Sequence, residues 1–163
     1  MREIKHSALV AQPPARLYAL INDIESYPRF IPWCTHARVL SKSDREIVAT
    51  IGVRQGPLQS EFTTRNELEQ DRRIMMHLVT GPFKMLEGEW LLTPIARSDS
   101  PVNNGAAPLS TTTVDGGLGC RVQLTMKFAF KNRLTAVLFE QKFAETASSL
   151  MDAFVARARA LPP

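Results

Sequence analysis

The hydrophobic residues change their spacing along the chain, and each spacing predicts a different kind of element. Residues 2–11 combine alternation with a short apolar run, which predicts a strand. The proline pair that follows suits the entry of a helix. Beyond it, apolar residues recur at the spacing of one helix face and predict a short amphipathic helix: Leu17, Leu20, Ile21 and Ile24.

From residue 37 to residue 130 the apolar positions recur at every second residue, which predicts half-solvated antiparallel strands. The alternation is cleanest in CRVQLTMKFAF, where one face carries Val122, Leu124, Met126, Phe128 and Phe130. Residues 96–118 are small, polar and rich in Gly, Pro, Ser and Thr. They are predicted to form a long flexible loop, and their low complexity favours a tolerated insertion over a functional lid.

A long helix is predicted over residues 133–160, with one apolar stripe formed by Phe143, Ala147, Leu150, Met151, Phe154 and Ala158. Such a stripe needs an apolar surface to pack against, and the inward faces of about six or seven strands supply it. The predicted fold is therefore α+β. A curved antiparallel sheet wraps around the C-terminal helix, and the N-terminal helix lies near one end.

The segment ESYPRFIPWC does not fit either period. Pro28 and Pro32 are expected to prevent a regular element and to hold an irregular turn rigid. The segment nevertheless carries the aromatic residues Tyr27, Phe30 and Trp33, which normally belong in a core. Two interpretations remain open at equal weight: the aromatics close one end of the core, or they form the mouth through which a ligand enters.

The length of 163 residues fits one domain that spans residues 1–163. A formal net charge of +4 weakly favours acidic partners such as RNA or anionic lipid headgroups, although the basic residues are scattered. No apolar run is long enough to cross a bilayer or to act as a signal peptide, so we expect a cytoplasmic protein. Cys34 and Cys120 are expected to stay reduced.

Groups that carry catalysis are not evident in the sequence. The histidines have no neighbours at metal-ligand spacing, and Cys34 has no identifiable base, so an inert buried thiol is expected. Glu87 and Glu89 alternate with Trp90 and are expected to face solvent. The Met and Phe residues of the inner faces are core, or they line a cavity for a lipophilic ligand. We therefore predict no catalytic residue, no metal and no catalytic cofactor.

Several motifs resemble the Coq10 and ribosome-association-toxin RatA family of the START-like, polyketide-cyclase-like superfamily. They are YALINDIESYPRFIPWC, FTTRNEL, GPFKMLEGEW and MDAFVARARAL. The resemblance covers nearly the whole chain except residues 96–118 and the last few residues. It implies a helix-grip fold, in which a seven-stranded antiparallel sheet grips a long C-terminal helix. It also implies one of two non-enzymatic functions.

The first function is the binding of ubiquinone or a related isoprenoid quinone between sheet and helix, in support of respiration, with transient peripheral contact at the inner membrane. The alternative is a toxin that binds the large ribosomal subunit and blocks subunit association. A cyclase activity of the wider superfamily is least favoured. From the family pattern and the Met- and Phe-rich inner faces, the expected ligand-binding residues are Tyr27, Phe30, Trp33, Phe62, Phe83, Leu86, Trp90, Met126, Phe128, Phe143, Met151 and Phe154.

Overall fold

The computed structural model describes residues 1–96 and 118–160 of the chain. Its strands are β1 (Arg2–Val10), β2 (Cys34–Lys42), β3 (Glu46–Gln55), β4 (Leu58–Glu69), β5 (Arg73–Thr80), β6 (Phe83–Ala96) and β7 (Leu118–Phe130). Its helices are α1 (Pro14–Asn22), the 3-10 helix η1 (Ile24–Ser26), the single turn α2 (Tyr27–Phe30) and α3 (Arg133–Ala160). The predicted bounds of the long C-terminal helix are confirmed.

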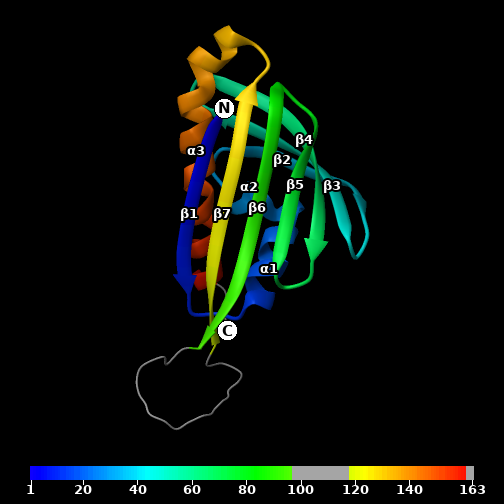
Figure 1. The fold of residues 1–163 in the computed structure, drawn as a ribbon, viewed down its shortest axis with the longest axis vertical. Coiled ribbons are helices and arrows are strands. Elements are labelled where there is room, and N and C mark those ends of the chain that lie inside the picture. Colours follow the sequence, from blue (N-terminus) through cyan, green and yellow to red (C-terminus); the bar gives the residue numbers. More distant parts are fainter. Residues whose placement is uncertain (97–117, 161–163) are drawn as a thin grey trace.

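All seven strands form one antiparallel sheet in the order β1-β7-β6-β5-β4-β3-β2. The sheet curves around α3, and the short helices α1 and α2 lie beside the lower part of α3 (Figure 1). Hairpins connect the strands from β2 to β6, while β1 joins the ladder next to β7, with Arg2 opposite Phe128 and Val10 opposite Cys120. The predicted α+β helix-grip architecture is confirmed.

Aromatic side chains from α3 and the inner sheet face make the contact between the two layers. The ring of Phe143 lies 4.8 Å from that of Phe128 and 5.0 Å from that of Phe83, measured between centroids. Phe83 also stacks on Phe130 at 4.9 Å. Each such pair adds about 0.5–1.5 kcal/mol beyond the burial of its area. This cluster fixes the N-terminal half of α3 against β6 and β7.

The expectation that no regular element runs through ESYPRFIPWC is wrong for its first half. Tyr27–Phe30 forms the helical turn α2, directly after η1. Pro28 is tolerated there because the first turn of a helix leaves its backbone N–H groups without partners inside the helix. Ile31, which precedes Pro32, is extended and ends the turn. The Tyr27 hydroxyl donates to the carbonyl of Ile21 and ties α2 to α1.

The side chains of β4 alternate between the two sheet faces as predicted, but not every side chain on the outer face is exposed to solvent. Thr50 and Thr63 lie opposite each other and are buried, and their hydroxyl oxygens are 2.7 Å apart. The predicted loop also begins and ends differently, because Ala96 and Leu118 pair in the β6–β7 ladder. The rest of that predicted loop, residues 97–117, lies outside the described residues.

Candidate functional site

A hollow of about 60 Å³ lies inside the grip, between the inner sheet face and α3. Its walls come from strands β3 to β7, from α3, and from the segment around α2. Part of the predicted ligand-binding set lines it, namely Tyr27, Trp33, Phe62, Leu86, Trp90, Met126 and Phe143. The structure therefore brings these residues, which come from five separate stretches of sequence, around one space.

The remaining predicted residues do not line the hollow. Phe83, Phe128, Met151 and Phe154 are buried in the core, and Phe30 is half-buried. Phe154 has a packing role, since its ring centroid lies 5.3 Å from Tyr27, 5.4 Å from Phe30 and 5.3 Å from Trp90. These contacts place Phe154 behind the wall of the hollow rather than in it.

The same wall contains polar residues that were not among the predicted ligand-binding residues. Thr64, Asn66 and Thr146 are buried and line the hollow. The Thr64 hydroxyl donates to Asn66 Oδ1 at 2.8 Å, and the Thr146 hydroxyl donates to the carbonyl of Lys142 at 2.9 Å. The alternation along β4 could have indicated the burial of Thr64 and Asn66, because Asn66 follows Phe62 and Thr64 at intervals of two and so lies on the same inward face. Asn is mostly exposed in proteins, and composition alone points the other way.

The hollow has adaptable walls on the β5–β7 side. Gly88 lies in the wall, and a Cβ atom there would come within 2.4 Å of Met76 Cε and 3.7 Å of Met126 Cε. Methionine has several rotatable bonds and fills irregular space. The two thioether chains therefore occupy the room that the glycine leaves and can yield it by rotation.

The size of the hollow limits what it holds in this conformation. Pockets that bind drug-sized ligands begin at about 300 Å³, whereas this space is about 60 Å³. A quinone ring with an isoprenoid tail therefore requires the Met side chains, the α2 segment or α3 to move outward. The predicted quinone cavity is closed here.

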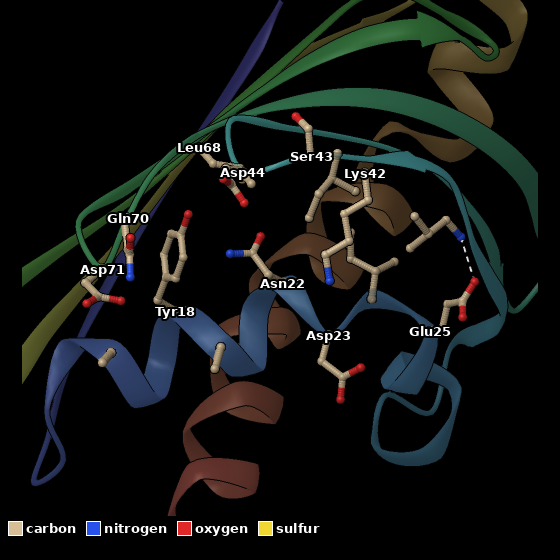
Figure 2. A pocket seen from close by; sticks show the side chains of 15 residues that line it. Tyr18, Asn22, Asp23, Glu25, Lys42, Ser43, Asp44, Leu68, Gln70 and Asp71 are labelled. Carbon is tan, nitrogen blue, oxygen red and sulfur yellow. Dashed lines mark hydrogen bonds between the residues drawn. The ribbon is translucent and has the colours of Figure 1, made fainter.

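A second, larger depression lies outside the grip, beside α1 and η1, and was not predicted. It is an open groove of about 1020 Å³ between these helices and the β2–β3 and β4–β5 turns. Figure 2 shows Tyr18, Asp44 and Asp71 around it, and Glu25 accepting a 2.9 Å hydrogen bond from the Val39 amide. Ile24 lines both the groove and the hollow, so its buried side chain belongs to the partition between them.

The two cysteines are buried and unpaired with each other. Burial raises the pKa of each thiol to about 11, which is partly opposed by hydrogen bonds to the backbone. A thiol with such a pKa is almost entirely protonated at neutral pH and is a poor nucleophile. Burial likewise raises the pKa of Tyr27.

One histidine meets a hydroxyl that is distant in sequence. His6 Nε2 on β1 lies 3.0 Å from Ser148 Oγ on α3, beside a shallow polar groove. A nucleophilic serine also needs donors for the oxyanion of its intermediate. The backbone amides around Ser148 are within α3, where helix hydrogen bonds engage them. The contact between His6 and Ser148 therefore has a structural role, in that it joins β1 to α3.

Two further observations concern the described residues only. His, Cys, Asp and Glu side chains do not gather there in any group of three or more that would hold a metal ion. Likewise, none of the helices in these ranges has the length and apolar character to cross a membrane.

Comparisons with known proteins agree with this geometry. Residues 10–155 match the family described as polyketide cyclase / dehydrase and lipid transport. The ribosome association toxin RatA of Escherichia coli K12 is 33% identical over 159 residues, which is 98% of this chain and 88% of the relative. The solution structure of CC1736 from Caulobacter crescentus aligns with a TM-score of 0.66 and 25% identity, over 98% of this chain and 97% of that one.

The crystal structure of the Zhui aromatase/cyclase from Streptomyces sp. R1128 aligns with a TM-score of 0.74 over 97% of this chain and 93% of that one. At 17% identity it shows the shared fold alone. The chain belongs to the polyketide cyclase / dehydrase and lipid transport family, and its RatA relatives place it among the RatA-type members of that family.

Proposed function

We propose that this protein acts as a RatA-type toxin that binds the large ribosomal subunit and opposes subunit association, without catalysing a reaction. The observation that carries the proposal is the 33% identity to a ribosome association toxin over 98% of this chain. Ribosome binding, the alternative function expected from the sequence, is therefore favoured over quinone binding.

The distribution of charge indicates which surfaces are available for ribosomal RNA. On the outer face of the central strands, acidic and basic side chains are paired, as in Arg73–Glu89 at 2.6 Å and His77–Glu67 at 3.1 Å. Arg38 on edge strand β2 and Arg45 in the β2–β3 turn are exposed and lie outside the ion pairs found in the described part of the chain, as do Lys5 and Arg121 on β1 and β7. Arginines of this kind neutralise phosphates and release counterions.

The test is binding of the purified protein to isolated large subunits, measured by co-sedimentation at several salt concentrations. We expect affinity to fall as salt rises and to fall further in the double variant Arg38→Glu/Arg45→Glu. The matched control is Lys5→Glu/Arg121→Glu, which reverses two exposed charges on β1 and β7. Absence of sedimentation with large subunits at low salt would overturn the proposal.

A second function is favoured by a specific observation, the apolar hollow with a buried Thr64–Asn66 pair in its wall. We propose that a lipophilic molecule enters this space after the walls move, with its tail among the Met and Phe side chains. Ubiquinone or a related quinone is the first candidate. Burial of each CH₂ group contributes about 0.8 kcal/mol, so the tail dominates affinity. The polar pair then selects the headgroup.

Lipid extraction of protein purified from its native host, followed by mass spectrometry, tests the second proposal. A stoichiometric lipophilic molecule that also protects the protein against thermal unfolding supports it. Protein that is free of lipid and takes up no ubiquinone in titration contradicts it, and leaves the ribosome proposal untouched.

A further inference from the structure

Helix α3 begins beyond the part of the sheet that grips it. Figure 1 shows the first turns of α3 rising past the ends of β1 and β7. The first residue of α3 that is buried is Phe143, two to three turns after the helix starts at Arg133. Ala136 and Phe139 in these first turns pack against the core, so the tip of α3 is open to solvent on its other face.

The tip carries large apolar side chains that the core does not use. Leu134, Val137 and Leu138 are 66%, 76% and 58% exposed. Their spacing of three and four residues puts them on one face of α3, opposite the face that carries Phe143 and Ala147 into the core. Further along the helix, the outward face carries Gln141, Glu145 and Asp152, all exposed. The apolar surface is thus confined to the tip.

Cations flank these apolar residues at the start of the helix. Lys131 and Arg133 flank the start of the helix, and both are exposed. The amide of Lys131 donates to the carbonyl of Pro82 at 3.0 Å, which brings the exposed Lys84, at the start of β6, to the same end. The sequence from Lys131 to residue 139 contains no acidic residue, and the next one, Glu140, pairs with Arg2 at 3.9 Å.

We propose that the α3 tip, defined by Leu134, Val137 and Leu138 with Lys84, Lys131 and Arg133, docks on the surface of an anionic lipid bilayer. The aliphatic side chains enter the interfacial region, and the cations contact lipid phosphates. A second copy of the chain is a poorer occupant, since a symmetric contact would bring the cations of both tips together. This interaction goes beyond the ribosome proposal and does not depend on it.

Vesicle co-sedimentation tests the proposal with the full chain. The vesicles are made of phosphatidylcholine alone or of an equimolar mixture with phosphatidylglycerol. We expect binding to the anionic vesicles only, weakened by salt. Leu134→Gln/Leu138→Gln should lower the affinity by about tenfold or more, because the apolar contribution is lost. Lys131→Gln/Arg133→Gln should lower it by about thirtyfold, since two cations that contact lipid phosphates are lost.

The matched control is Leu9→Gln/Leu40→Gln, which replaces leucines that are 55% and 53% exposed on the two edge strands. It should bind vesicles like the unchanged protein, and thermal unfolding should show that all variants fold. Equal binding to both vesicle types, or full binding by Leu134→Gln/Leu138→Gln, would overturn the proposal. So would sedimentation-equilibrium evidence that the leucines hold a dimer that does not bind vesicles.

Discussion

Trp33 donates a hydrogen bond from its indole Nε1 to Ser149 Oγ on α3, with 2.8 Å between the two atoms. The Ser149 hydroxyl in turn donates to the carbonyl of Thr146 at 2.8 Å. Trp33 is also held through its backbone, because its carbonyl accepts from the amide of Arg54 at 2.8 Å. The segment ESYPRFIPWC is thus fixed to both layers of the grip, and its Trp side chain forms part of the wall of the hollow.

Removal of the Trp33–Ser149 bond should lower stability modestly. Ser149→Ala is expected to reduce the free energy of unfolding by about 1 kcal/mol, the usual net worth of such a bond, and Trp33→Phe by more, because it also removes part of a ring that packs against the core. Because both remove one interaction, the double variant should lose less than the sum. Urea unfolding followed by circular dichroism measures this. Full additivity of the two losses would mean that the bond is absent in solution.

The hollow should accept additional methyl groups. Ala49→Val directs two methyl groups into a space of about 60 Å³ from a strand, where β-branched residues are favoured. We expect a gain of about 1 kcal/mol in the free energy of unfolding, typical of cavity filling. The control Ala129→Val changes a β7 position outside the hollow and should be near neutral.

The same variant separates the two proposed functions. Ala49→Val should weaken the uptake of any lipophilic molecule into the hollow and leave ribosome binding unchanged. A loss of ribosome binding in this stably folded variant would instead couple the hollow to the ribosome-binding surface.

The Thr64–Asn66 pair should show the cost of leaving a buried polar group without a partner. Asn66→Leu removes the acceptor of the Thr64 hydroxyl, and we expect a loss of about 1–3 kcal/mol. Thr64→Val/Asn66→Leu removes both polar groups and should recover part of that loss. Thermal and urea unfolding of the single and double variants measure the difference. If the double variant is no more stable than Asn66→Leu alone, the pair is not an isolated bond.

The buried cysteines predict slow thiol chemistry and a pH-dependent loss of stability. With the pKa of Cys34 and Cys120 at about 11 rather than 9.0, the thiolate fraction at pH 8 is about a hundredfold lower than in the unfolded chain. A disulfide reagent should therefore react slowly until denaturant is added. Because the native state holds these protons more tightly, stability is complete below about pH 9 and falls as pH rises toward about 11. Rapid native-state labelling would contradict the burial of both thiols.

The architecture was predictable because the hydrophobic pattern of each element is set by residues that are close together in the sequence. Strict alternation in residues 120–130 and the stripe of α3 each encode the face that becomes buried, and the sheet-around-helix arrangement follows from the need to cover that stripe. The seven strands and the bounds of α3 agree with this expectation. The turn α2 was missed because proline disfavours helix interiors but not first turns.

The site was less predictable because it depends on contacts between distant residues. Alternation indicated that Phe62 and Phe128 face inward. Only the packing distinguishes Phe62, which lines the hollow, from Phe128, which fills the core. Asn66 was missed because Asn is mostly exposed in proteins, although it follows Phe62 and Thr64 on the same face of β4. The contact of Trp33 with Ser149 spans 116 residues and has no local signature.

We propose that the protein binds the large ribosomal subunit and opposes subunit association. The most direct measurement mixes purified large and small subunits with increasing amounts of the protein and follows assembled ribosomes on sucrose gradients. We expect assembled ribosomes to decrease as the protein is added and the protein to migrate with the large subunit. Arg38→Glu/Arg45→Glu should weaken both effects. An unchanged fraction of assembled ribosomes at saturating protein would contradict it.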